Sequence, residues 1–484
     1  MRHLMHRDSE GLIAQLLQAV GSSGLVLGDE MAPYAQGARY GNGKAACVVR
    51  PCSSEEVSAV VKACAERGVV VVPQGANTGL VGASTPDESG SQVVLSLTRL
   101  RRRCEVDAIN RTVFVDAGVL LHELNDKLES HDLWFPIDLA ADPSVGGMVA
   151  ANTGGTRLLR YGDVRHNLLE VEAVLFDPPG KLVKFGAPLR KNNTGFDLMQ
   201  LFVGTSGAAG IVTGATLEVR ARPKQVATCL VVPSSDAAVA SLLLAAEAEL
   251  GDYLSAFEGL SSNALELALE HVPSLRNPFA GEPIPEFSLL IEISSTAVPG
   301  GAVDVEQLLL GFLEERLGGD ISNAAMGKGG DLWQLRHSLS DGARALGKVL
   351  GFDISVRRSD VMRFRREAAA LVGARYPQLV VADFGHVGDG GLHYNLVWPH
   401  RSSQPHASEV VEQVRAELYA LAVERFGGSY SAEHGVGPHN HAFYMKYTDD
   451  ELISLSGKLQ RLLDPKELSG RVRFGRPQPP VLNT

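Results

Sequence analysis

Two histidines stand on either side of a glycine-rich tetrapeptide, Gly388-Asp389-Gly390-Gly391. Glycine supplies the backbone freedom for a tight reversal, so the flanking residues are expected to form two antiparallel strands. In the simplest hairpin closed by this tetrapeptide, His386 faces His393 across the turn. Because side chains alternate along a strand, both imidazoles then point to one side and can reach the same metal ion. The residues expected on this face are Phe384, His386, His393 and Asn395.

A third candidate ligand, Glu433, follows in the segment 431–435, and His434 stands next to it. Two histidines and one carboxylate form a common catalytic zinc set that leaves one coordination position open. The same ligand types also suit manganese. Asp389 is expected to cap the turn rather than to bind the ion. Two ordinary core histidines are the alternative, which is weaker because the pair flanks one turn and a carboxylate is available.

Three glycine-rich loops indicate a large cofactor. The first, residues 73–84, follows the apolar run 69–72, which predicts a buried strand. Its bare backbone can present consecutive N–H groups to a pyrophosphate. It contains neither a Walker sequence nor G-x-G-x-x-G opening a helix, so the usual nucleotide fingerprints do not apply. The second and third loops, 142–155 and 204–212, allow close approach of a flat ligand. A plain surface turn is the alternative for the first loop taken alone.

The elements that would position these residues combine helices and strands. Ser53-Ser54-Glu55-Glu56 has the form of a capping box, and apolar residues at helical spacing follow it as far as Gly68. Together with the apolar run after Gly68, this predicts a strand–helix–strand start. Further strands are expected at 93–97, 112–116, 170–176, 210–220 and 288–294, and further helices at 120–130, 361–373 and 407–425.

The composition excludes several classes of function. A chain of 484 residues is expected to form two or three domains. Its net charge of −11, without a basic stripe, argues against a nucleic-acid surface. Five cysteines without a CxxC pair predict a reduced, cytoplasmic protein without disulfides. The start resembles no signal peptide and no apolar run is long enough to span a membrane, so a transmembrane protein is not expected.

Five motifs in series resemble the flavin-dependent D-2-hydroxyacid dehydrogenases, which have the PCMH-type FAD fold of the vanillyl-alcohol oxidase group. The D-2-hydroxyglutarate dehydrogenases look nearest, and the D-lactate dehydrogenases and the glycolate oxidase large subunit look like cousins. The resemblance covers nearly the whole chain in the right order. It rests on the segments 73–84, 142–155, 190–198, 386–395 and 431–435.

The resemblance implies an α+β protein of three parts. Residues 1–225 would form a PCMH-type FAD-binding domain. Residues 226–425 would form an α+β substrate-binding domain of the FAD-linked oxidase C-terminal type. Residues 426–484 would pack back on the flavin domain.

The resemblance also implies roles for individual residues. FAD would bind without a covalent bond, since the loop 75–79 contains neither histidine nor cysteine. His434 would be the general base, Arg336 would bind the substrate carboxylate, and Asn395 would contact the substrate. A divalent metal, zinc with manganese as the alternative, would bind to His386, His393 and Glu433. The residues assigned to FAD are Pro73, Gly75, Ala76, Asn77, Thr78, Gly79, Gly82, Ser84, Pro143, Ser144, Gly147, Asn152, Gly154, Gly155 and Ile211.

One departure from the family concerns the substrate. Family members usually carry a lysine two residues before the aspartate of Phe352-Asp353-Ile354-Ser355, where it contacts the distal part of a dicarboxylic substrate. This chain has Gly351 at that position. The expected reaction is therefore oxidation of a D-2-hydroxy acid, D-2-hydroxyglutarate-like or D-lactate-like, to the 2-oxo acid, and the side chain of the acid stays open.

Two other functions of the same fold stay open: a flavoprotein oxidase that uses O₂, and an inactive flavin-binding electron-transfer subunit. The joint presence of metal ligands, base and carboxylate clamp favours the dehydrogenase. Its expected electron acceptor is a carrier such as an electron-transfer flavoprotein or a quinone. The sequence does not decide the oligomeric state, with a homodimer as one option. His439 and His441 are expected to face solvent near the mouth of the site.

Overall fold

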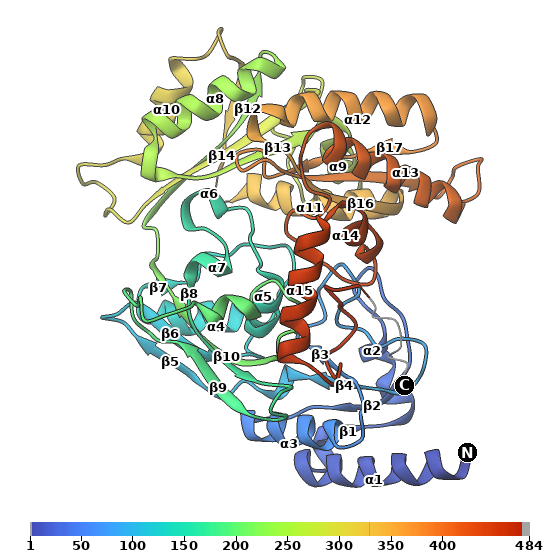
Figure 1. Ribbon diagram of the computed structural model, residues 1–484. Coiled ribbons are helices and arrows are strands. Elements are labelled where there is room, and N and C mark those ends of the chain that lie inside the picture. The colour runs from blue at the N-terminus through green and yellow to red at the C-terminus, as the bar shows by residue number, and fades with distance from the viewer. Residues whose placement is uncertain (1, 329, 477–484) are drawn as a thin grey trace.

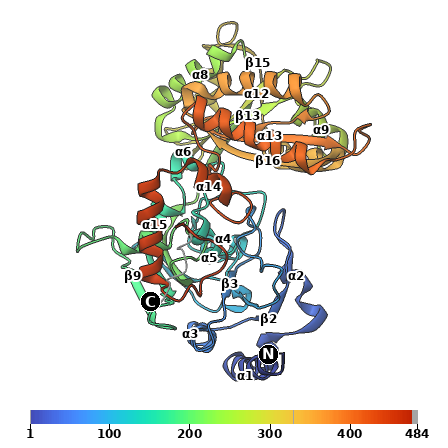
Figure 2. The same ribbon diagram turned by 45° about the vertical axis from the view of Figure 1, so that its right-hand side comes forward.

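The computed structural model describes residues 2–328 and 330–476. Two bodies, each combining helices and sheets, are stacked on one another, and the N-terminal part of the chain forms one of them (Figure 1). From the second body, α15 (Asp450–Leu463) runs back along the first, as both views show (Figure 2). Within the described ranges, no helix is both long and apolar enough to cross a membrane.

The first body opens with the predicted strand–helix–strand unit, in which β2 (Ala45–Val49) and β3 (Val71–Gln74) both lie parallel to β4 (Gln92–Ser96). The connection is α3 (Ser54–Ala65), whose N-cap Ser53 accepts a hydrogen bond from the Glu56 N–H. The Glu56 carboxylate accepts from the Cys52 N–H, so this half of the capping box reaches one residue further back than expected. The sheet consists, in order, of β1 (Leu25–Val26), β2 (Ala45–Val49), β4 (Gln92–Ser96) and β3 (Val71–Gln74).

A second, antiparallel sheet completes this body. In sheet order it consists of β5 (Cys104–Asp107), β6 (Thr112–Asp116), β10 (Ile211–Glu218), β8 (Leu168–Val174) and β9 (Leu182–Gly186). The helices of this body are α1 (Arg2–Val20), α2 (Ala32–Ala35), α4 (Leu121–Glu129), α5 (Val145–Ala151) and α7 (Val164–Asn167). The short helix α6 (Leu158–Tyr161) packs instead against β13 (Leu254–Ser261) of the second body. Buried residues of α5 pack against the antiparallel sheet and thereby place the second glycine-rich loop above it.

The second body is built on an eight-stranded sheet. Its strands are, in order, β15 (Ile321–Met326), β12 (Gln225–Pro233), β14 (Phe287–Ser295), β13 (Leu254–Ser261), β18 (Phe384–Gly385), β19 (Gly391–Pro399) and β16 (Gly347–Ser355), with β17 (Val380–Val381) paired to β19. One face is covered by α8 (Asp236–Glu249), α10 (Val305–Glu314), α12 (Val361–Arg375) and α13 (Ser408–Ala420), and the other by α9 (Ser262–His271) and α11 (Asp331–Leu346). Successive side chains of a strand point to opposite faces of the sheet. Because helices cover both faces, the strands carry apolar residues on both sides.

Two predicted elements end differently from the expectation. The helix expected to reach residue 425 ends at Ala420 and continues as one π-helical turn, Leu421–Arg425. The strand expected over 210–220 is β10 up to Glu218, after which β11 (Arg220–Ala221) pairs with β7 (Leu133–Trp134) in a separate ladder. The apolar pattern continues through both interruptions, so periodicity alone could not reveal them.

The C-terminal segment returns to the first body. After α14 (His441–Tyr447) and α15, Ser469 forms a parallel bridge with Val71 of β3, and the Val71 N–H donates to the Leu468 carbonyl. The buried side chain of Leu468 joins the core around α3. Residues 477–484, which end the segment predicted to pack back, lie outside the described residues.

Candidate active site

The histidine hairpin has a different register from the predicted one. Phe384, not His386, pairs with His393, which is a shift of two residues. The turn is larger because three N–H groups, those of Asp389, Gly390 and Gly391, all donate to the His386 carbonyl at 3.0 Å. Asp389 Oδ1 also accepts from the Gly391 N–H at 2.8 Å, which is the capping role expected of it.

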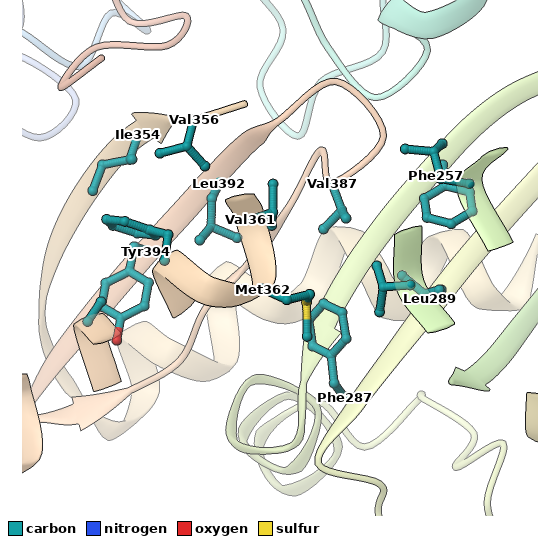
Figure 3. Packing of buried hydrophobic residues seen from close by; sticks show 14 of the residues in the cluster. Phe257, Phe287, Leu289, Ile354, Val356, Val361, Met362, Val387, Leu392 and Tyr394 are labelled. Atoms are coloured by element: carbon teal, nitrogen blue, oxygen red, sulfur yellow. The ribbon is translucent and has the colours of Figure 1, made fainter. Parts of the chain in front are cut away.

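A shift of two residues preserves the face on which each side chain lies, so the two imidazoles still meet. Their ring centroids are 5.1 Å apart. Figure 3 shows Val387, Leu392 and Tyr394 of the same hairpin pointing into the core beside Val361 and Met362 of α12. The intervening side chains therefore face the opposite side, where the sheet borders a cavity.

His386 is oriented by a carboxylate. Its Nδ1 lies 2.8 Å from Oε1 of Glu258, a residue of β13 whose side chain is only 1% exposed. Its Nε2 is buried and has no hydrogen-bond partner in the described part of the chain. A carboxylate at one imidazole nitrogen keeps the proton there and leaves the lone pair of the other for a metal. The orphaned Nε2 therefore fits a metal ligand better than a core histidine.

Glu433 completes the predicted ligand set. Its Oε1 lies 3.4 Å from Nε2 of His393 and 3.9 Å from Nε2 of His386. Burial alone would lower the pKa of His386, but Glu258 and Glu433 raise it well above its ordinary value. Burial lowers the pKa of His393 to about 3, which keeps that imidazole neutral. The carboxylates of Glu258 and Glu433 thus attract positive charge at His386, while the neutral imidazole of His393 keeps a lone pair that could bind a divalent cation.

Asp353 belongs to a cluster of possible metal ligands with His393, Glu433 and His434, whose ligand atoms lie within 4.8 Å of one another and which does not include His386. We assign it a different role. Its Oδ2 accepts hydrogen bonds from the N–H groups of Glu433, at 3.0 Å, and His434, at 2.8 Å. The same oxygen lies 3.4 Å from Nδ1 of His434. Asp353 therefore holds the Glu433–His434 segment against β16 and orients the imidazole of His434.

Arg336 extends from α11 and shares Glu258 with His386. Its Nε and Nη2 lie 2.8 Å and 2.7 Å from Glu258 Oε2. Burial alone would raise the pKa of Glu258, but the charges of His386 and Arg336 lower it to about 2. One buried carboxylate therefore orients both the proposed metal ligand and the proposed carboxylate clamp. Glu258 is not among the residues predicted from the sequence, although a carboxylate within the apolar strand 254–261 is a signal for a buried, partnered charge.

One cavity of about 340 Å³ borders both the glycine-rich loops and the proposed catalytic side chains. Those in its lining are Arg336, His386, His393, Glu433 and His434. Asn395 and Gly351, which pair between β19 and β16, line it together with His434. Arg39, which the sequence analysis did not select, lines it as well. The predicted cofactor residues in the lining are Pro73, Gly75, Ala76, Asn77, Thr78, Gly79, Ser84, Pro143, Ser144, Gly147, Gly154 and Ile211.

Three predicted cofactor residues, Gly82, Asn152 and Gly155, do not line the cavity. Gly82 lies against Gly41, and Gly155 lies against the Asp138 backbone, where a Cβ would come within 2.6 Å of the carbonyl oxygen. Asn152 ends α5 in the left-handed conformation, and its amide donates to Asp163 at 2.8 Å. The segment 190–198 also lies outside the cavity lining, and Phe196 in it is 95% exposed.

The cavity fits an extended, flat cofactor with a phosphate group. A Cβ on Gly75 would lie 2.2 Å from the Ser144 hydroxyl, so the two loops approach more closely than any other residue would allow. Gly79 has open space where its Cβ would stand. Consecutive bare N–H groups at such a loop are suited to a pyrophosphate. The donor set thus agrees with the FAD site expected from the sequence.

The prediction that His439 and His441 face solvent holds only in part, because both residues are half-buried. His439 stacks on Tyr40 with ring centroids 3.4 Å apart, and burial lowers its pKa to about 3. Nε2 of His441 lies 2.6 Å from the Arg473 carbonyl. The ring of His439 thus connects the C-terminal segment to the first body, whereas His441 makes a contact within that segment.

Known protein families match two long segments of the chain. The family model described as FAD binding domain matches residues 45–186, and that of the C-terminal domain of FAD linked oxidases matches residues 222–470. A D-2-hydroxyglutarate dehydrogenase of Xanthomonas citri pv. viticola is 32% identical over 422 residues, 86% of this chain and 86% of the relative. A D-2-hydroxyglutarate–pyruvate transhydrogenase of Saccharomyces cerevisiae is 33% identical over 449 residues, 89% of this chain and 87% of the relative.

Solved structures share the fold at lower identity. p-Cresol methylhydroxylase with substrate bound has a TM-score of 0.75 at 16% identity and 95% coverage of both chains. An alkyldihydroxyacetonephosphate synthase has a TM-score of 0.71 at 16% identity, over 96% of this chain and 84% of the other. The expected fold class is thereby confirmed. This chain belongs to the FAD-dependent D-2-hydroxyacid dehydrogenase family, with a PCMH-type FAD-binding domain followed by an FAD-linked oxidase C-terminal domain.

Proposed function

We propose that this protein is an FAD- and metal-dependent dehydrogenase that oxidises a D-2-hydroxy acid to the 2-oxo acid. The observation that carries the proposal is the convergence of three possible metal ligands and a neighbouring imidazole on the cavity that the glycine-rich loops also line. FAD, held without a covalent bond, would accept the electron pair. A divalent metal, zinc or manganese, would be held by His386, His393 and Glu433 and would act as a Lewis acid.

The chain's own residues divide the remaining work. Arg336, pre-oriented by Glu258, binds the C1 carboxylate of the acid. Asn395 contacts the acid from the neighbouring strand. His434 takes the hydroxyl proton on Nε2, because its Nδ1 faces Asp353, whose charge stabilises the imidazolium that forms. The same arrangement operates in His–Asp pairs of other enzymes.

The curated relatives are named for D-2-hydroxyglutarate, which makes this dicarboxylic acid the first substrate to test. The reduced enzyme would pass its electrons to a carrier such as an electron-transfer flavoprotein or a quinone. The test is anaerobic bleaching of the purified yellow protein by a panel of D- and L-2-hydroxy acids. Bleaching by D-acids is expected, and bleaching by L-acids alone would contradict the stereochemistry.

Removal of the metal tests whether the reaction requires a divalent cation. Incubation with a chelator, followed by desalting, is expected to abolish bleaching while the flavin stays bound. Zinc or manganese, added back, should restore it, since the Lewis acid contributes several kcal/mol to the transition state. A metal-free preparation that bleaches at the original rate would show that the three-ligand cluster has another role.

A further inference from the structure

Arg39 reaches the cavity from an element that none of the other site residues share. It lies in the loop 36–42 of the first body, whose ends form an isolated β-bridge. Its neighbour Tyr40 stacks on His439 with the rings 11° from parallel, which ties the loop to the C-terminal segment. The bridge between the loop ends and the stacked Tyr40 therefore fix the backbone that carries Arg39. The side chain of Arg39 extends toward Gly351 of the second body.

The position of the guanidinium is defined by Gly351. A Cβ built on this glycine would lie 2.2 Å from Nη1 of Arg39 and 3.3 Å from Oδ1 of Asn395. The guanidinium thus occupies the space that a side chain at position 351 would fill, and it lies beside the proposed substrate contact on the paired strand. Only glycine at position 351 leaves this space free.

Within the part of the chain that the structure describes, no carboxylate pairs directly with the guanidinium of Arg39. The other arginine in the cavity lining, Arg336, has a buried carboxylate partner in Glu258. Among the described residues Arg39 has no ion pair, and the carboxylate that acts on its charge is Asp353, which already accepts two backbone N–H groups. Burial lowers the pKa of Arg39. A partly desolvated guanidinium without a counter-ion favours binding of an anion.

We propose that Arg39 is a specificity-determining residue that binds the far carboxylate of a dicarboxylic D-2-hydroxy acid. This inference rests on the proposed function, in which Arg336 and Asn395 bind the C1 end of the same acid. A guanidinium binds a carboxylate through two parallel hydrogen bonds, so it selects an acid with a second carboxylate over one with a methyl group there. Binding of an FAD phosphate instead is the competing role that the test must separate.

The test compares two five-carbon acids that differ at the far end, D-2-hydroxyglutarate and D-2-hydroxyvalerate. In Arg39→Ala, KM for the dicarboxylic acid should rise about 10- to 100-fold, which corresponds to loss of a charged hydrogen-bonded pair. The KM for the monocarboxylic acid should change by no more than about twofold. Arg39→Lys should recover part of the loss. The assignment is wrong if the preference between the two acids is unchanged, or if the Ala variant loses its FAD.

Arg344→Ala is the matched control, because Arg344 is exposed, is paired with Asp341 and acts on the charge of Arg39 from outside the cavity lining. It should leave the preference unchanged. Gly351→Ala should displace the guanidinium and lower the dicarboxylic preference, whereas in the Arg39→Ala background it should have almost no further effect. Equal effects of Gly351→Ala in both backgrounds would contradict the proposed position of the guanidinium.

Calorimetric binding of 2-oxoglutarate and 2-oxovalerate gives a readout that does not need turnover. Arg39→Ala should weaken the first ligand about 10- to 100-fold and leave the second within about twofold. If no D-2-hydroxy acid bleaches the wild-type flavin, the proposed function fails while this measurement still decides the role of Arg39. Equal weakening of both ligands would exclude a contact with the far carboxylate.

Discussion

Glu258 is the residue on which both His386 and Arg336 depend for their orientation. Its carboxylate is buried, and each of its oxygens has a partner in the proposed site. Residues that orient a metal ligand from behind tune the affinity for the metal as strongly as some ligands do. The orientation of both side chains is therefore controlled by a residue that lies outside the cavity lining.

Glu258→Gln should lower metal affinity about 10- to 100-fold, because the neutral amide holds His386 less firmly and leaves Arg336 unpaired. The FAD content should stay at the wild-type level, since Glu258 lies outside the glycine-rich loops. Chelator competition followed by metal analysis measures the effect. Glu266→Gln on the exposed side of α9 is the control, and equal metal retention in both variants would contradict the role of Glu258.

His434→Ala should slow reduction of the flavin by the substrate by about 10²- to 10⁴-fold, which is the usual contribution of a general base. Because the metal ligands and the loops are untouched, metal and FAD should both remain bound. Stopped-flow bleaching under anaerobic conditions measures the rate. A variant that reduces its flavin as fast as the wild type would require another group to take the proton.

At the scale of elements, the hairpin between β18 and β19 depends on one glycine in its turn. Gly390 has φ +92°, and a Cβ there would lie 2.2 Å from the Val356 carbonyl. Gly390→Ala should destabilise the protein by roughly 1–3 kcal/mol, because the turn must strain or shift. Thermal unfolding measures the loss, and weaker metal binding should accompany it.

Gly373→Ala provides a control of opposite sign for this prediction. Gly373 lies within α12, is exposed and has open space around its Cβ position. The substitution should stabilise the helix by about 0.5–1 kcal/mol, because alanine loses less backbone freedom than glycine on folding. If both substitutions shift the melting temperature in the same direction, strain in the turn is not the cause.

At the scale of the whole molecule, Arg157 connects the two bodies across the cavity. It pairs with Asp138 of the first body at 2.6 Å and with Glu292 of the second at 2.9 Å. Glu292 is buried and also accepts from the Trp333 indole at 2.6 Å. The relative placement of the FAD loops and the proposed metal site thus depends partly on one guanidinium between two carboxylates.

Arg157→Ala should lower the free energy of unfolding by about 3–5 kcal/mol, because it leaves a buried carboxylate without its counter-charge. Burial alone would raise the pKa of Asp138, but His337 and Arg157 lower it to about 2. The ionised Asp138 therefore contributes fully to the free energy of unfolding above about pH 4, and this contribution is lost as the pH falls toward 2. Denaturant unfolding measures both effects, and an unchanged midpoint in Arg157→Ala would contradict the role of this connection.

Much of the secondary structure could be predicted from local patterns. The strand expected at 112–116 is β6, and the helix expected at 120–130 is α4 to within one residue at each end. Alternation and helical spacing are local properties, so they do not depend on the rest of the fold. The ends that were misplaced, at β11 and at the π-helical turn, are positions where pairing with a distant segment or packing against neighbours determined the backbone.

For the site, the sequence by itself determined which residues are the candidates for chemistry and on which face of the hairpin they lie. The glycine loops, the pair His386 and His393, and Glu433 beside His434 all follow from residue type and spacing. Even the error in register left the face unchanged, because a shift of two residues preserves the alternation of side chains.

Only the tertiary structure decided how these residues are held and what charge the cavity leaves for a ligand. Glu258 lies 78 positions from Arg336 and 128 from His386, and Asp353 lies 81 from His434. Arg39 lies over a glycine that is more than three hundred positions away in the chain. Electrostatic energies depend on distance in space and on burial. Neither quantity can be derived from the spacing of residues along the sequence.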